Sequence, residues 1–376
     1  MHLTRRNFLG AAGALTTLTL WPGVSMATPN DTCMLVVLLR GGMDGLHVIV
    51  PRDDPAYSRL RGNLAPTDAL TLDADFAVHP SMQFAHELYE RKQLLPVVAI
   101  APPYRMRSHF EAQDCLENGT AKAGGASTGW LNRCAASMPG AEAVSLTTVM
   151  PLIMRGPGEA TTWSPPLPEE VNPILLQRLQ TLYAADPRLA AAFARAVDNQ
   201  GRGLAGGGGA RLPQAMVAAA NFMSKAGGPR LGFVEDSGWD THSNQGSVLK
   251  RKLNELDAGL RAFHDGVGAV WGRTVVVVVT EFGRTAAANG TGGTDHGTGG
   301  LALLAGGAVK GGRIAGDWPG LAPGALNEGR DLRATSDTRA LLKGVLASHL
   351  GVSETALESK VFPDSGGTRA MDGLVA

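Results

Sequence analysis

The sequence predicts an α/β protein built around a doubly wound sheet. Three runs of consecutive apolar residues, at Met34–Leu39, Leu95–Ala101 and Thr274–Thr280, do not alternate with polar residues. This pattern is typical of parallel strands that are buried on both faces. Helical periodicity appears between and after these runs. Because strands that alternate with helices form parallel sheets, the order of the segments indicates the α/β class.

Four segments carry the helical pattern. Between Leu249 and Val267, apolar residues recur at spacings of three and four and form the buried face of a helix that leads into the third strand. Further helices are predicted over Pro173–Asn199 and Gln214–Lys225. Near the carboxyl end, Ser336 is expected to be the N-cap of a helix rich in leucine and valine.

The amino terminus has the features of an export signal. Arg5-Arg6 precedes a mildly apolar run over Phe8–Trp21, and Ser25-Met26-Ala27 resembles a cleavage site. A pair of arginines before such a run is typical of a twin-arginine signal. We expect residues 1–27 to engage the twin-arginine translocase, which places the mature protein in the periplasm or outside the cell. A buried amino-terminal helix is the structural alternative.

The remaining chain, residues 28–376, is expected to form a single α/β domain with a helical insertion around residues 165–230. The glycine-rich stretch Gly201–Gly209 is expected to be a surface loop. No run reaches the about 18 apolar residues of a membrane helix, so no transmembrane anchor is expected. The three cysteines are too few for a disulfide framework, and their spacing matches no zinc motif.

The charge composition excludes one class of partner. The chain has 34 Lys and Arg against 34 Asp and Glu, so its formal net charge is zero. A general nucleic-acid-binding protein needs a basic excess to contact phosphates, and this chain has none. The 49 glycines instead indicate many tight turns and close backbone approaches.

Polar residues follow each predicted strand. Ligand sites of open α/β sheets form beyond the carboxyl ends of the strands, so these segments are the first candidates for function. Asp44 follows the first strand, Arg107–His109 follows the second, and Glu281–Arg284 follows the third. Two further segments, Asp240–His242 and Asp295–His296, combine a carboxylate with an imidazole.

Carboxylates and imidazoles together are ligands for Zn²⁺, Mn²⁺ or Mg²⁺, and histidine favours Zn²⁺ or Mn²⁺. A divalent ion lowers the pKa of a bound water or hydroxyl and stabilises a developing oxyanion. Neighbouring arginines suit a phosphoryl or sulfuryl group. The segments therefore indicate a divalent metal site that handles an anionic ester.

Each candidate also has a purely structural interpretation. Asp44 could hydrogen-bond its own loop, and Asp240 could cap a helix that begins near residue 242. Ser108 could be a helix N-cap, with Glu111 completing a capping box. The pair Asp295–His296 lies among Gly and Thr, where a core role is hard to explain. The other histidines are expected to be structural or on the surface: His47, His79, His86, His264 and His349.

Six segments, in this order along the chain, resemble a large bacterial family of twin-arginine-exported proteins, the domain of unknown function 1501. They are LLRGGMDGLHVIVP at Leu38–Pro51, RSHFEAQDCLENG at Arg107–Gly119, GWLNR at Gly129–Arg133, DTHSNQ at Asp240–Gln245, TEFGRTAAANGTGGTDHG at Thr280–Gly297 and GGAVKGGRIAGDWPGL at Gly306–Leu321. The family is grouped with the alkaline phosphatase and sulfatase superfamily. The resemblance implies a central, mostly parallel sheet with helices on both faces.

The resemblance also implies roles for the candidate residues. Superfamily members hold one or two divalent metals beside a nucleophile. The positions that match the metal ligands are Asp44, Asp240, His242, Glu281 and His296. The catalytic positions are Ser108 as nucleophile, with His109 or Asp295 to move protons. The positions expected to bind the anionic group are Arg107, Arg284 and Asn289.

Two departures from the superfamily bear on activity. Where relatives have Asp-His after the late strand, this chain has Glu281-Phe282, which removes an imidazole. The Cys-x-Pro-x-Arg signature of sulfatases is absent. The leading hypothesis is an exported metal-dependent hydrolase of phosphate or sulfate esters, acting on an anionic small molecule or polymer. The alternatives are a non-catalytic periplasmic binding protein and an envelope protein whose glycine-rich loops contact a partner.

Overall fold

The computed structural model describes residues 32–164, 173–187, 189–191, 193–194 and 212–376. The predicted export signal and the loop Gly201–Gly209 lie outside the described residues, as does part of the helix predicted over Pro173–Asn199. Among the described residues, no helix combines the length and the apolar character that crossing a membrane requires.

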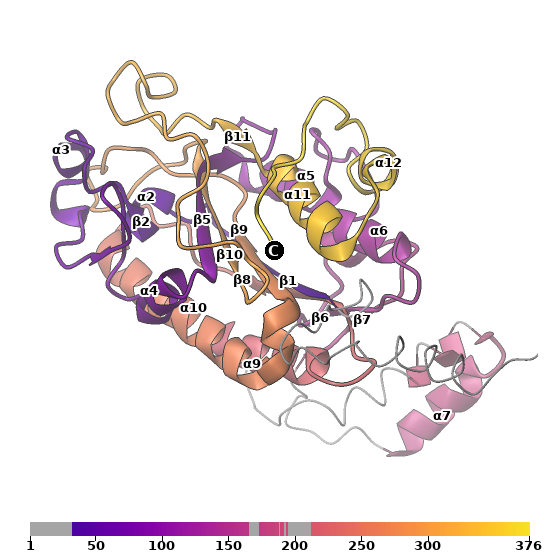
Figure 1. Ribbon diagram of the computed structural model, residues 1–376. Coiled ribbons are helices and arrows are strands. Elements are labelled where there is room, and N and C mark those ends of the chain that lie inside the picture. The colour runs from indigo at the N-terminus through magenta and orange to yellow at the C-terminus, as the bar shows by residue number, and fades with distance from the viewer. Residues whose placement is uncertain (1–31, 165–172, 188, 192, 195–211) are drawn as a thin grey trace, which may run out of the picture.

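An eight-stranded sheet forms the centre of the protein (Figure 1). Across the sheet the strands are β11 (Ser336–Asp337), β5 (Leu94–Ala101), β10 (Gly300–Ala305), β9 (Thr274–Val279), β1 (Cys33–Leu39), β8 (Leu231–Asp236), β6 (Ala143–Ser145) and β7 (Ala160–Thr162). All neighbours are parallel except β10, which is antiparallel to both β5 and β9. A smaller sheet contains β2 (Ile49–Val50), β4 (Ala77–Val78) and β3 (Leu70–Thr71).

Successive residues of the central strands enter two different cores because side chains alternate across a sheet. In β1, Leu35 and Val37 pack in the core under α4 (Gln83–Glu90), α9 (Leu212–Met223) and α10 (Gln245–Val267). Met34 and Val36 face the core under α5 (His109–Asn118), α6 (Trp130–Ala136) and α11 (Thr338–Leu350). The mostly parallel sheet with helices on both faces confirms the predicted fold class.

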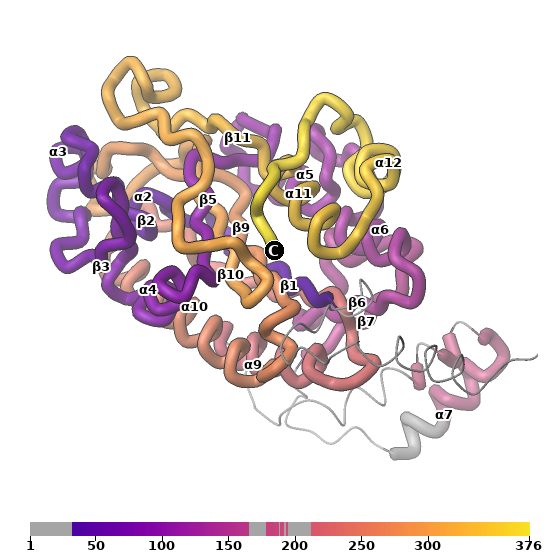
Figure 2. The backbone as a smooth tube through the Cα atoms, viewed as in Figure 1, coloured from indigo at the N-terminus to yellow at the C-terminus, as the bar shows by residue number. Residues whose placement is uncertain are grey.

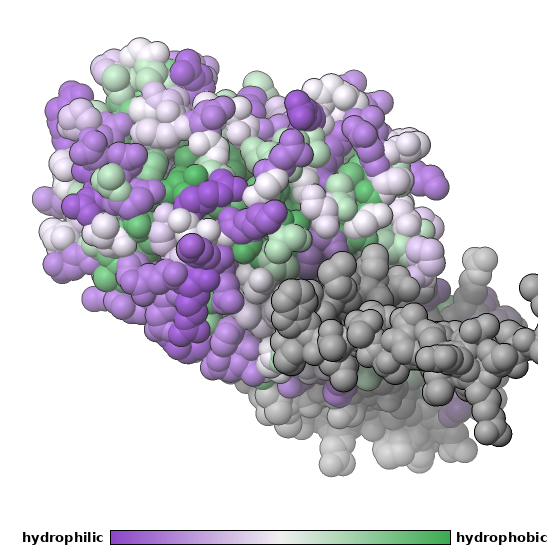
Figure 3. Space-filling model, viewed as in Figure 1, coloured by the Kyte–Doolittle hydropathy of each residue, from purple (hydrophilic) through white to green (hydrophobic). Residues whose placement is uncertain are grey.

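The remaining elements connect these layers. They are α2 (Gly45–Val48), α3 (Tyr57–Arg61), η1 (Gly62–Leu64), η2 (Leu152–Met154), α7 (Pro173–Tyr183), η3 (Gly268–Arg273), α12 (Glu354–Ala356) and η4 (Leu357–Val361). Hydrophilic side chains gather over α4 and α10 on the face shown in Figure 3, opposite their buried sides. The end of the chain returns to the segment after β10, where Val375 pairs with Val309 (Figure 2).

The structure differs from the sequence-based prediction at one helix cap and in two strands. Ser336 is not the N-cap of the last long helix. It is extended and pairs with Ile100 in the sheet, so α11 starts one residue later than predicted, with Asp337 accepting a hydrogen bond from the Arg339 amide at 2.8 Å. The sequence analysis also missed β8 and β10. All three cysteines are buried, and none of them forms a disulfide.

Candidate metal centre

Segments that are far apart in the sequence meet at one edge of the sheet. Parallel strands β5, β1, β8 and β9 end at this edge, and the antiparallel strand β10 begins there. The loop after β5 therefore brings His109, and the loop after β8 brings Asp240 and His242. His296 arrives from the opposite direction, just before β10 begins. The reversed strand thus adds an imidazole to an edge that otherwise receives only strand exits.

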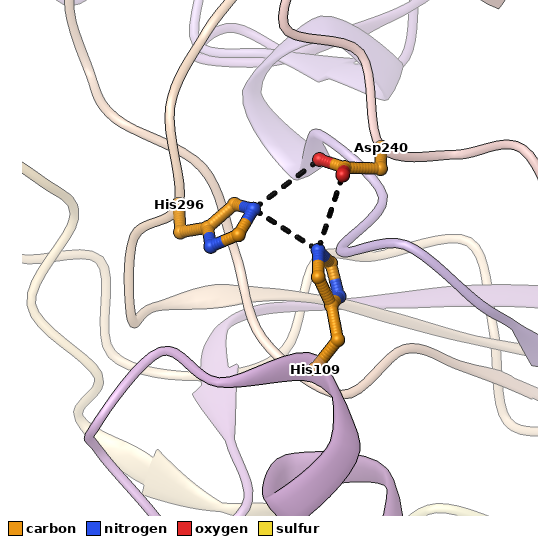
Figure 4. A group of neighbouring side chains, drawn as sticks. All are labelled: His109, Asp240 and His296. Atoms are coloured by element: carbon orange, nitrogen blue, oxygen red, sulfur yellow. Dashed lines mark hydrogen bonds and ion pairs between the residues drawn. The ribbon is translucent and has the colours of Figure 1, made fainter.

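Three of these side chains form a compact group (Figure 4). The ligand atoms of His109, Asp240 and His296 all lie within 4.8 Å of one another. The Nε2 atoms of the two histidines are 3.0 Å apart. One Asp240 oxygen lies 3.4 Å from His109 Nε2, and the other lies 3.3 Å from His296 Nε2.

His242 extends this group. Its Nε2 atom is 3.0 Å from His296 Nε2 and 3.0 Å from Asp240 Oδ1. We call His109, Asp240, His242 and His296 the His/Asp cluster. It brings together three of the five residues that the resemblance matched to metal ligands, and it adds His109, which was expected to move protons.

The other ring nitrogen of each histidine has its own hydrogen-bond acceptor. The acceptors of Nδ1 are Glu281 Oε1 for His109 at 2.7 Å, Asp295 Oδ1 for His242 at 3.0 Å and the Arg107 carbonyl for His296 at 3.0 Å. A carboxylate or a carbonyl can only accept, so each neutral ring carries its proton on Nδ1. The three Nε2 lone pairs therefore point into the cluster, as they do in metal sites, where outer acceptors fix the tautomer.

Glu281 lies behind His109 and is fully buried. Besides the imidazole, it accepts hydrogen bonds from the Gly41 amide and from Gln113 Nε2, both at 2.8 Å. Burial alone would raise the pKa of Glu281, but the hydrogen bonds from His109 and Gln113 outweigh it and lower the pKa. The ionised carboxylate in turn raises the pKa of His109 through their hydrogen bond, against the opposing effect of burial.

Arg284 holds Asp240 in place. Its guanidinium is buried, donates to Asp240 Oδ1 at 2.6 Å and also donates to the carbonyl of Thr294. Burial raises the pKa of Asp240, but the hydrogen bond from Arg284 outweighs this effect and the pKa is lowered. Burial lowers the pKa of His296, followed in size by the charge of His109. The cluster therefore combines a charged Asp240 carboxylate with imidazoles whose pKa values shift in opposite directions, raised for His109 and lowered for His296.

Glycines allow the loops to approach this closely. Gly41 has φ of +123°, and a Cβ atom there would lie 2.4 Å from the Asp240 amide nitrogen. A Cβ atom at Gly293 would lie 2.3 Å from the His242 carbonyl carbon. The backbones that carry two cluster residues therefore touch positions where only glycine fits.

Two residues that were expected to bind an anionic group instead contact the site from behind. Arg107 donates to Glu328 at 2.7 Å and to Asp331 at 3.1 Å, and its carbonyl orients His296. Asn289 Nδ2 donates to the His242 carbonyl at 2.9 Å and to Asp295 Oδ1 at 3.3 Å. Buried Asp331, which the sequence analysis did not single out, also accepts from the Thr298 amide at 2.8 Å.

Asp44 lies in a different environment. It is fully buried in an ion pair with Arg61, and it accepts from Gln245 Nε2 at 2.6 Å and from the Leu46 amide at 3.2 Å. Burial raises its pKa, but the charge of Arg61 and its hydrogen bond outweigh this effect and lower it. The carboxylate thus caps its own helix α2, which corresponds to the structural interpretation of this residue.

Ser108 precedes helix α5 in extended backbone geometry, but its side chain makes no capping hydrogen bond. Glu111 instead accepts from the hydroxyl of Tyr104, so the predicted capping box is not formed. Asp240 is not a cap either, because Asn244 is the N-cap residue of α10. The structural alternatives for Ser108 and Asp240 therefore do not account for them.

Comparisons with known proteins agree with the resemblance. Residues 175–361, about half of the chain, match the family described as "Protein of unknown function (DUF1501)". A search of curated proteins found no match.

Solved structures are similar at low identity. A putative sulfatase from Bacteroides thetaiotaomicron is 9% identical with a TM-score of 0.43, covering 91% of this chain and 74% of its own. A protein in the alkaline phosphatase superfamily from Vibrio parahaemolyticus is 12% identical with a TM-score of 0.40, covering 76% and 62%. The structure of Ps i-CgsB in complex with k-i-k-neocarrahexaose is 8% identical with a TM-score of 0.45, covering 86% and 72%. These similarities do not establish an activity for this chain.

Proposed function

We propose that this chain, which belongs to the DUF1501 family, is a metal-dependent hydrolase of phosphate or sulfate esters. The observation that carries the proposal is the convergence of three imidazole Nε2 atoms and one carboxylate in the His/Asp cluster. The Nε2 lone pairs that lie 3.0 Å apart, His109 with His296 and His242 with His296, repel each other unless a proton or a cation lies between them. Three imidazoles with one carboxylate favour Zn²⁺ or Mn²⁺ over Mg²⁺, which prefers oxygen ligands.

The cluster supports a single metal ion. Among the residues that the structure describes, His109, Asp240 and His296 of this cluster are the group of His, Cys, Asp and Glu whose ligand atoms converge, and His242 adjoins His296. Asp44 has its charge compensated by Arg61, so it does not need a second cation. A divalent ion bound at the cluster supplies Lewis acidity. It lowers the pKa of a bound hydroxyl or water and stabilises the negative charge that develops on the ester in the transition state.

The chain's own residues perform the other tasks. Glu281, Asp295 and the Arg107 carbonyl keep the imidazole lone pairs directed inward. Ser108 adjoins His109 in sequence, and its side chain makes no capping hydrogen bond to α5. We therefore propose Ser108 as the nucleophile. Asp295 is half exposed and uses one oxygen to hold His242, which leaves the other oxygen to accept a proton.

Metal analysis and ester hydrolysis of the purified protein test this proposal together. We expect about one Zn²⁺ or Mn²⁺ per chain and hydrolysis of a phosphate or sulfate monoester. His296→Ala should lose both, whereas the matched control His86→Ala, at a half-buried histidine outside the cluster, should keep both. Circular dichroism shows whether each variant is folded. Folded wild-type protein that takes up no metal would contradict the proposal.

The variant Ser108→Ala tests whether the Ser108 hydroxyl or a water molecule attacks the ester. If Ser108 is the nucleophile, the variant keeps its metal and loses most of its hydrolysis. Full activity in Ser108→Ala would assign the attack to water instead. A wild-type protein that binds metal but hydrolyses no ester would favour the non-catalytic binding protein, an alternative motivated by Glu281-Phe282 in place of Asp-His.

We also propose that residues 1–27 direct export through the twin-arginine translocase. The support is the sequence pattern Arg5-Arg6 before an apolar run. Replacing both arginines by lysine should retain the protein in the cytoplasmic fraction of its bacterial host. Unchanged export of that variant would contradict the assignment.

A further inference from the structure

Two large apolar side chains beside the metal-binding His109 are exposed to solvent. Met106 precedes it by three residues and is 78% exposed, and Phe110 follows it directly and is 90% exposed. Such side chains are more stable when they are removed from water. Apolar exposure next to a functional group marks a surface that contacts a ligand or partner.

The segment that presents these side chains is held in a fixed conformation. Arg107, between them, has a left-handed φ of 60°, a region that is unfavourable for a residue other than glycine. Its guanidinium pairs with buried Asp331 and with Glu328, and its carbonyl accepts from His296. These contacts fix the backbone between Met106 and Phe110 relative to His296.

Exposed charge around the cluster is mainly negative. Asp240, Asp295 and Glu328 expose 40%, 51% and 66% of their side chains. Buried Arg284 pairs with Asp240, and Arg107, 24% exposed, pairs with both Glu328 and buried Asp331, so with Arg330, 38% exposed, these cations offset only part of the negative charge. A substrate with many anionic groups would be repelled by these carboxylates. A substrate with one anionic group, bound at the metal, would not be.

We propose that the substrate is a monoester whose alcohol part is apolar, an alkyl or aryl group that packs against Phe110 and Met106 while its single anionic group lies at the cluster. This inference rests on the proposed hydrolase function and deepens it. Phe110 supplies a flat apolar surface with few rotatable bonds, which suits such a group. It acts in specificity and takes no part in bond cleavage.

Two esters with alcohols of similar acidity test the inference, 3-phenylpropyl and glycerol monoesters of phosphate or of sulfate, whichever the metal-loaded wild type cleaves. We expect the phenylpropyl ester to have the higher kcat/KM. Phe110→Ala should lower that value about tenfold, through KM, and leave the glycerol ester and the metal content unchanged. The matched control is Leu182→Ala, at another exposed apolar residue, on α7. It should change neither ester.

The outcomes distinguish the two levels of the proposal. If the wild type cleaves neither ester, the hydrolase function fails and the inference fails with it. If it cleaves both equally, or if Phe110→Ala lowers both equally, the function stands and the inference is overturned. A third result also overturns it: Phe110→Ala weakens binding to phosphatidylglycerol vesicles but leaves both kcat/KM values unchanged. Phe110 would then be a membrane contact.

Discussion

His109 Nε2 and His296 Nε2 face each other across 3.0 Å, and when both rings are neutral with the proton on Nδ1, neither ring offers the other a proton. Their Nδ1 protons are donated to Glu281 and to the Arg107 carbonyl. Two bonds of about 2.0–2.1 Å to one tetrahedral Zn²⁺ would separate two ligand nitrogens by about 3.3 Å. The observed spacing is close to this value, so the pair is arranged for a shared cation.

Glu281→Gln should weaken metal binding while the protein stays folded. The amide cannot replace a charged acceptor whose Oε1 atom alone receives three hydrogen bonds, including the one from His109. Loss of an outer-shell carboxylate costs about 10–100-fold in metal affinity. Competition with a chromophoric chelator measures this change. Glu255→Gln, on α10, is the matched control, and equal affinities for the two variants would contradict the assigned role of Glu281.

Asp44→Asn separates an ion-pair role from a metal-ligand role. Removing one partner of a buried ion pair leaves Arg61 uncompensated and should cost about 3–5 kcal/mol of unfolding free energy. The metal content per chain should remain that of the wild type. Urea denaturation and elemental analysis measure the two quantities. The exposed Asp372→Asn should change neither. A lower metal content in folded Asp44→Asn would instead support Asp44 as a ligand.

Asp331→Asn should loosen the metal site from a distance. Asp331 is fully buried and joins Arg107 to the loop of Thr298, which follows His296 closely in sequence. Its ion pair with Arg107 also helps to hold that residue in its left-handed backbone conformation. We expect roughly a tenfold loss of metal affinity. Glu328→Gln, which removes only the exposed partner of Arg107, should have a smaller effect. The reverse order would show that Asp331 does not position the loop.

Two buried histidines predict a loss of stability in mild acid. Burial lowers the pKa of both His47 and His79 from 6.5 to about 4. Between these values the unfolded chain binds more protons, so the unfolding free energy is fully present above pH 6.5 and declines as the pH falls toward 4. At about pH 5 each histidine should contribute a loss of about 2 kcal/mol. Urea denaturation of metal-free protein at two pH values measures it.

The controls for this prediction are two histidine variants. His79→Gln should remove about half of the decline, because its amide does not titrate, and His86→Gln, at a half-buried histidine outside this pair, should leave the decline unchanged. An identical pH dependence in His79→Gln and wild type would contradict the assignment to buried neutral rings.

The strands were predictable where local pattern was strong and were missed where it was weak. The valine run of β9 is apolar throughout and was recognised. Strand β8 ends in Glu-Asp and β10 reads GLALLA, a short run that a helix could equally adopt. Because β8 was missed, the sequence showed that Asp240 and His242 combine ligand types but not that they follow a strand. The position of His296 depended in the same way on the unrecognised β10.

By itself the sequence determined the class of fold and the stock of metal-binding side chains, since burial of apolar runs and ligand chemistry are local properties. The tertiary structure alone decided which side chains meet. It placed the ring of His109 beside that of His296, which lies 187 positions further along the sequence. It also paired Asp44 with Arg61 in a buried ion pair. The physical reason is that strand order and direction bring distant loops to one edge, and neither is encoded in the spacing of neighbouring residues.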